Sequence, residues 1–125
     1  MNVLLLEPDV VLARLYSAAL KAAEFQVQWR QTGQAAIKCI DDLFPDLIIM
    51  ELQLRGHNGM AFLYELRSYT DLRNIPVILN SSVPPDLFTG ADKAFSSFGV
   101  TSYLYKPATS IDRLVEHAQA AISLI

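Results

Sequence analysis

Hydrophobic residues along this chain fall into short runs, separated by longer stretches with helical spacing. Two runs, residues 2–6 and 45–51, are largely apolar and end at a carboxylate, which is typical of strands buried on both faces of a parallel sheet. Residues 75–80 and 102–105 predict two further strands. A fifth run, residues 25–30, alternates apolar and polar positions and therefore predicts an edge strand.

Between these runs, apolar residues three and four positions apart predict helices. The predicted helices cover residues 10–23, 33–43, 59–68, 91–97 and 110–122. Pro84, Pro85 and Gly90 make the segment before the fourth helix the least regular. Alternation of strand and helix predicts an α/β, flavodoxin-like (βα)5 doubly wound fold with a parallel sheet. The edge position of the second strand fits the order 2-1-3-4-5.

Composition narrows the class of protein. With 125 residues, 52% of them apolar, we expect one domain over residues 1–125 with a substantial core. A net charge of −3 with both signs mixed argues against direct nucleic-acid binding. The single cysteine, Cys39, excludes an internal disulfide, and we expect it to be buried on its helix. No signal sequence or bilayer-length apolar run is present, so we expect a cytoplasmic chain without a membrane partner.

Polar side chains follow four of the five predicted strands. They are Glu7 with Asp9, Glu51, Ser81 and Lys106. Because the carboxyl ends of parallel strands meet at one edge of a sheet, these groups should lie together. Each alone could be a solvated turn or a strand-end cap. Together, carboxylates beside a hydroxyl and an ammonium form a small polar site suited to a phosphoryl group or a divalent cation.

The segments that carry these residues resemble a response-regulator receiver (CheY-like) domain, over nearly the whole chain. The matching segments are residues 3–9, 45–54 with Gly56 and Gly59, 75–81 and 103–107. In that family, an acidic pair after the first strand helps bind magnesium, and an aspartate after the third strand accepts a phosphoryl group from a histidine kinase. A Ser or Thr and a Lys then contact that group, and an aromatic residue on the fifth strand reorients. Ser81, Lys106 and Tyr103 match these positions.

Two positions depart from the family pattern. Glu51 stands in place of the phospho-accepting aspartate, and Pro8 replaces the second acid of the pair, leaving Glu7 with Asp9 beside it. Glutamate is longer by one C–C bond, about 1.5 Å, and phosphoryl transfer depends on placement at the ångström level. Pro8 also removes a carboxylate from a site where magnesium needs near-octahedral oxygen ligands. We therefore expect no cofactor and assign no metal ligand; any Mg²⁺ binding should be weak.

These departures predict an atypical receiver, or pseudo-receiver, in two-component or phosphorelay signal transduction. It is not an enzyme; it acts as a protein-interaction or dimerisation module, with Glu51 as a built-in partial phosphomimic. An equal alternative is that Glu51 only forms an ion pair with Lys106, which locks the domain in one structure and prevents switching. A second hypothesis is an orthodox phosphorelay receiver phosphorylated at another acid, such as Asp9. A third hypothesis is a phosphatase with an aspartyl nucleophile. Such an enzyme needs an aspartate at the position of Glu51 and a second acid close by, and this chain has neither.

The expected partners are signalling proteins, namely a histidine kinase, an output domain or a second copy of the chain. The resemblance implies an interaction face on the fourth helix, fifth strand and fifth helix. That face would include Phe88, Phe95, Tyr105 and parts of residues 112–120. Alternatively, the phenylalanines fold inward and fill the core. The resemblance also implies a cis peptide bond between Lys106 and Pro107.

Overall fold

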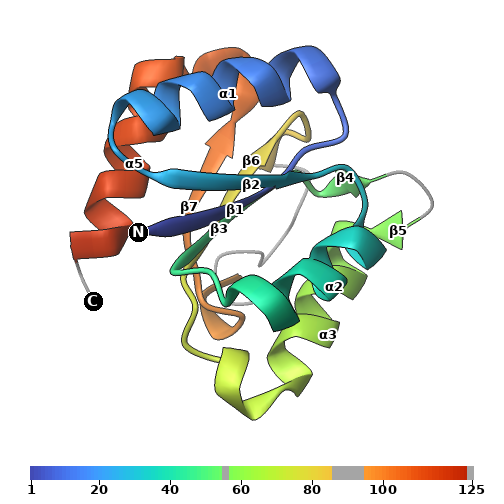
Figure 1. Cartoon of the computed structure of the whole chain (residues 1–125). Helices are drawn as coiled ribbons and strands as arrows, with labels where there is room; N and C mark the ends of the chain where they lie inside the picture. Colours follow the sequence, from blue (N-terminus) through green and yellow to red (C-terminus); the bar gives the residue numbers. More distant parts are fainter. Residues whose placement is uncertain (55–56, 86–94, 124–125) are drawn as a thin grey trace.

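The computed structural model describes residues 1–54, 57–85 and 95–123, and its centre is a five-stranded parallel sheet (Figure 1). The strands are β1 (Asn2–Leu6), β2 (Gln26–Arg30), β3 (Leu47–Met50), β6 (Val77–Ser81) and β7 (Val100–Tyr105). Their order is β2-β1-β3-β6-β7, and every pairing is parallel. This is the flavodoxin-like order predicted from the sequence, with the alternating strand β2 at an edge.

Helices cover both faces of the sheet (Figure 1). The described helices are α1 (Val10–Ala22), α2 (Gly33–Leu43), α3 (Gly59–Ser68) and α5 (Ile111–Ser123). The sheet packs on α1 and α5 on one side and on α2 and α3 on the other, which creates two hydrophobic cores. Of the predicted fourth helix, residues 95–97 are helical, and residues 91–94 lie outside the described part.

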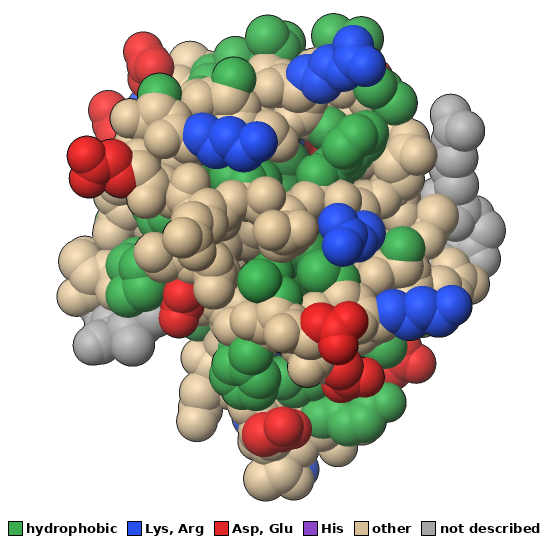
Figure 2. Space-filling model, in the orientation of Figure 1, with side chains coloured by type: hydrophobic (Ala, Val, Ile, Leu, Met, Phe, Trp, Pro, Cys, Tyr) green, Lys and Arg blue, Asp and Glu red, His purple; other side chains and the backbone are tan. Residues whose placement is uncertain are grey.

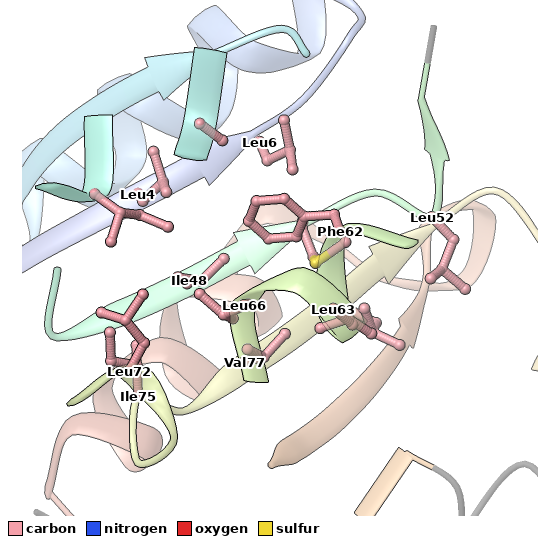
Figure 3. Close-up of a cluster of buried hydrophobic side chains, with 14 of the residues drawn as sticks. Leu4, Leu6, Ile48, Leu52, Phe62, Leu63, Leu66, Leu72, Ile75 and Val77 are labelled. Atoms are coloured by element: carbon pink, nitrogen blue, oxygen red, sulfur yellow. The ribbon is translucent and has the colours of Figure 1, made fainter. Parts of the chain in front are cut away.

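The strand β1 contributes to both cores because successive side chains of a strand point to opposite faces. Leu4 and Leu6 lie in the core beneath α2 and α3, whereas Val3 and Leu5 lie in the core beneath α1 and α5. Figure 3 shows the ring of Phe62, from α3, directed toward Leu6. Full burial of each such side chain contributes about 1.5–3 kcal/mol. Burial of the central strands in both cores therefore fixes the position of the polar residues at their carboxyl ends.

The segment after β3, where the sequence predicted neither a strand nor a helix, contains two short strands. Gln53–Leu54 (β4) and His57–Asn58 (β5) pair as a small antiparallel ladder. Strands of two residues leave no periodicity in a sequence, because their pairing uses backbone groups alone. The side chain of Asn58 accepts a hydrogen bond from the Met60 N–H at 2.7 Å and caps α3, whose bounds match the predicted helix.

Candidate functional site

Glu51 follows β3 at the carboxyl edge of the sheet, and only 3% of its surface is exposed. Its Oε2 accepts hydrogen bonds from the backbone N–H groups of Leu52, at 2.7 Å, and Gln53, at 3.3 Å. The Ser81 hydroxyl donates to the same oxygen. Gly59 fixes the backbone here: its N–H donates to the Leu52 carbonyl at 2.9 Å, and a Cβ on Gly59 would lie 2.6 Å from that oxygen. Only glycine allows this close approach of α3.

The second oxygen of Glu51 is equally engaged. Its Oε1 accepts from the backbone N–H and the hydroxyl of Ser82, both at 3.0 Å, and from the Lys106 ammonium at 3.0 Å. The Ser82 Oγ also lies 3.1 Å from the Gln53 side-chain oxygen, so the two acceptors share its single hydrogen. Sequence reasoning assigned no role to Ser82 or Gln53. The one available signal was the serine pair at the end of β6, of which only Ser81 matched the family pattern.

Lys106 joins two carboxylates from different strands. Its Nζ lies 2.7 Å from Glu7 Oε1 and 3.0 Å from Glu51 Oε1, and the side chains of Lys106, Glu7 and Glu51 are 12%, 2% and 3% exposed. The other oxygen of Glu7 accepts from the Asp9 N–H at 3.0 Å. The expected ion pair between Glu51 and Lys106 is present, and Glu7 makes the shorter contact. We call Glu7, Glu51 and Lys106 the acid–lysine cluster.

Burial and ion pairing act differently on the three groups of the cluster. Burial raises the pKa of Glu7, and its bonds from Lys106 and the Asp9 N–H offset this only in part. Burial also opposes ionisation of Glu51, but hydrogen bonds from Ser81, Ser82 and Lys106 outweigh it and lower the pKa. For Lys106, burial favours the neutral amine, yet the two carboxylates prevail and raise the pKa. Glu51 is therefore the firmly ionised carboxylate, and Glu7 is the one that protonates more readily.

Tyr103 lies beside the same edge of the sheet. Its hydroxyl donates to the Val83 carbonyl at 2.6 Å, and the Val83 N–H donates to the Ser81 hydroxyl at 3.1 Å. Its ring centroid is 5.6 Å from that of Phe95. Burial raises the pKa of the Tyr103 phenol, so the hydroxyl stays a donor at neutral pH. Tyr103 thus fixes the backbone that follows Ser81 and Ser82.

The residues present do not form the magnesium site of an orthodox receiver. Pro8 has no side-chain oxygen to offer, and Glu51 spends both oxygens on protein donors. Asp9 is exposed and caps α1 by accepting from the Leu12 N–H at 3.0 Å. Within the described residues, no three acidic, histidine or cysteine side chains are grouped to hold a metal ion. These residues therefore do not fit the acidic-pair magnesium site that the family resemblance implies.

The expected interaction face needs one correction. Phe95 is 7% exposed and belongs to the core beneath α2 and α3, so it does not line a surface. It turns inward because the core and the Tyr103 ring offer it apolar contact. Tyr105 is half-buried on β7, and Phe88 lies outside the described residues.

The peptide between Lys106 and Pro107 is trans, since the described backbone contains no cis peptide. The expectation of a cis bond is therefore wrong. Here Pro107 lies in the first turn of the 3-10 helix η3 (Lys106–Ala108), where its fixed φ suits a helical turn.

Comparison with known proteins identifies the class. The sequence model of the response regulator receiver domain family matches residues 3–119, and the chain belongs to this family. It is thus a receiver domain of two-component signalling, a regulatory protein rather than an enzyme. The polar-differentiation response regulator DivK of Brucella ovis is 26% identical over 115 residues, which cover 92% of this chain and 90% of that protein.

Solved structures agree with this assignment. The signal receiver domain of a signal transduction histidine kinase from Syntrophus aciditrophicus superposes with a TM-score of 0.83 at 25% identity, covering 99% of this chain and 91% of that one. A sensor protein from Polaromonas sp. JS666 gives a TM-score of 0.87 at 19% identity, over 98% and 96% of the two chains, which is a likeness of fold alone. No helix in the described part of the chain has the length and apolar character that crossing a bilayer requires.

The first prediction concerns the charge of Glu51. Glu51→Gln should lower the free energy of unfolding at pH 7 by about 2–3 kcal/mol, because charge-assisted hydrogen bonds are lost. The folded pKa of Glu51 lies below its ordinary value of 4.5. The stabilisation is therefore present above that value and is lost as the pH falls through the folded pKa. Urea unfolding should show the difference between wild type and variant shrinking as the pH is lowered below 4.5.

The matched control is Glu65→Gln, which changes an exposed glutamate of α3. It should alter the free energy of unfolding by less than about 0.5 kcal/mol at either pH. A Glu51→Gln effect that is independent of pH would contradict the assignment of Glu51 as the ionised member of the acid–lysine cluster.

Proposed function

We propose that residues 1–125 form one pseudo-receiver domain, which transmits a signal through protein contacts without being phosphorylated. The observation that carries this proposal is the engagement of the Glu51 carboxylate by Ser81 and Lys106. These are the two groups that receivers use to contact a phosphoryl group. In this chain both groups donate hydrogen bonds to the Glu51 carboxylate instead. Glu51 therefore acts as a built-in partial phosphomimic, with one negative charge where a phosphoryl group has nearly two.

The same geometry opposes phosphoryl transfer to Glu51. A nucleophilic carboxylate must stand back from the groups that stabilise the incoming phosphoryl, whereas Glu51 reaches them directly. Its lowered pKa and six protein donors also reduce its tendency to attack. Pro8 removes a ligand for the cation that would neutralise charge during the transfer. Two separate requirements of the reaction are therefore missing.

The alternative is an orthodox phosphorelay receiver that uses another acid, with Asp9 as the candidate. Asp9 is a poor acceptor because it caps α1 through its Leu12 hydrogen bond. Its only bond to the acid–lysine cluster runs through its backbone N–H, which donates to Glu7. Neither Ser81 nor Lys106 makes a described contact with it. This alternative remains the outcome that the following experiment would detect.

Incubation with acetyl phosphate and magnesium should leave the mass of the intact protein unchanged. An orthodox receiver with an aspartate at the acceptor position serves as the positive control in the same buffer. A stoichiometric phosphoryl adduct would overturn the pseudo-receiver proposal. Loss of that adduct in Asp9→Asn or in Glu51→Gln would then identify the acceptor.

We further propose that the domain's partners are signalling proteins, either a histidine kinase, an output domain or a second copy of the chain. The curated relatives are response regulators of polar differentiation, which supports a regulatory role of the same kind. A two-state element biased by Glu51 would set the affinity for such a partner. If Glu51 merely locks one structure, Glu51→Gln would change stability and leave partner binding unaltered.

A further inference from the structure

A groove of about 390 Å³ lies between α1 and the edge strand β2. It is lined by Ala13, Arg14, Ser17, Ala18 and Lys21 of α1 and by Val27 and Trp29 of β2. We call it the α1–β2 groove. The side chains of α1 that face the groove at Ala13, Ser17 and Ala18 are small, so they do not fully cover the strand beneath. Val27 and Trp29 of that strand are therefore only half-buried.

Two cations border this groove. Arg14 and Lys21 are seven positions apart, which puts them on the same face of α1 about 10.5 Å apart along its axis. Both side chains are exposed. Within the described residues neither forms an ion pair, since both ion pairs found there belong to Lys106. Figure 2 looks onto α1 and β2 and shows Lys and Arg side chains beside hydrophobic ones on this face.

Trp29 gives the groove a fixed aromatic surface. Its indole N–H donates to the Glu7 carbonyl at 2.8 Å, which holds the ring in place and satisfies its one polar group. The rest of the ring offers an apolar π surface, and a ring held in advance loses little conformational entropy on binding. The same hydrogen bond connects the groove to the backbone of Glu7, a member of the acid–lysine cluster.

We propose that the α1–β2 groove binds a small ligand with a planar, apolar body and one or two anionic groups. The volume lies in the range of small-molecule sites, which combine an apolar lining with a few placed polar groups. Two cations that have no ion-pair partner among the described residues, over an apolar floor, are complementary to such a ligand, in a protein whose net charge is −3. Arg14 and Lys21 hold the anionic groups, and Trp29 and Val27 contact the body. This binding does not depend on whether the chain is phosphorylated.

The dye 8-anilino-1-naphthalenesulfonate has this chemistry and is the probe. Trp29 is the only tryptophan of the chain, so its emission reports directly on the groove. Titration at pH 7 should show saturable binding of one dye per chain, with Trp29 emission lost by energy transfer to the dye. The neutral analogue N-phenyl-1-naphthylamine should bind about tenfold or more weakly, because it lacks the anionic group.

Two variants test the residues. Arg14→Gln with Lys21→Gln should weaken dye binding about tenfold or more, through loss of both cations. Lys38→Gln with Arg73→Gln is the matched control, since both residues are exposed, lie elsewhere and change the net charge equally. Ala18→Leu should fill the groove and weaken binding to a similar extent, at an exposed position where leucine favours the helix.

Equal dye affinity in the two double variants, unsaturable binding, or unchanged Trp29 emission would each overturn the proposal. An acidic amphipathic peptide that saturates the Trp29 signal where the dye does not would make the groove a protein-docking surface and overturn the small-ligand assignment. If Trp29 emission changes with protein concentration alone, the groove binds a second copy of the chain, and this result would also overturn the small-ligand assignment.

Discussion

Pro8→Asp combined with Glu51→Asp is expected to convert an inert chain into one that takes a phosphoryl group from acetyl phosphate. The shorter side chain at position 51 draws the carboxylate back by about 1.5 Å, which releases Ser81 and Lys106 to contact the phosphoryl group. Pro8 lines an open surface pocket of about 330 Å³ with Asp9, Gln53 and Leu54. An aspartate at position 8 therefore faces the segment after Glu51, where it can supply a magnesium ligand.

Intact mass would be measured for wild type, both single variants and the double variant, with and without magnesium. Glu51→Asp alone should label feebly or not at all, because the metal site still lacks a carboxylate. Pro8→Asp alone should bind magnesium more tightly and remain unlabelled. The two effects should be strongly non-additive, since the residues act as one unit. Pro8→Asp with Glu51→Gln is the matched control and should stay inert.

Two results would contradict this account. If Glu51→Asp alone labels as well as the double variant, Pro8 is not the defect in the metal site. If the double variant stays unlabelled with magnesium present, Ser81 and Lys106 are not placed to stabilise a transferring phosphoryl group. In either case the roles assigned to these residues would need revision.

Lys106→Met is expected to cause the largest loss of stability among single substitutions in the site. It leaves Glu7 and Glu51 buried without their shared cation, and breaking such a pair costs about 3–5 kcal/mol. Lys38→Met, at an exposed position of α2, is the control and should cost less than about 0.5 kcal/mol. Urea unfolding at pH 7 would measure both, and equal midpoints and slopes would contradict the role of Lys106.

A second substitution separates electrostatics from packing. Glu7→Gln in the Lys106→Met background should restore part of the lost stability, because it removes the carboxylate whose pKa burial already raises. If the loss came from packing of the lysine stem alone, Glu7→Gln would not restore any of it. The coupling between the two positions should be of the order of 0.5–3 kcal/mol, as found for residues in contact.

The sequence by itself determined the architecture. Continuous apolar runs specified strands buried on both faces, and the alternating run placed β2 at an edge, because the burial of each position follows from local periodicity. The parallel order then required the residues after each strand to meet. That is why Glu7, Glu51, Ser81 and Lys106 could be brought together from the sequence. The starts of α1 and α3 were equally predictable from the sequence, and the side chains of Asp9 and Asn58 cap these helices in the structure.

Only the tertiary structure decided which atoms meet at the site. The Ser82 and Gln53 contacts with Glu51 depend on turn geometry, and the shorter contact of Lys106 with Glu7 depends on how three strands are staggered. Phe95 turned inward because a buried aromatic partner was available, which no local pattern encodes. The physical reason is that periodicity fixes which face of an element is buried, whereas contacts between residues distant in sequence depend on register and side-chain direction.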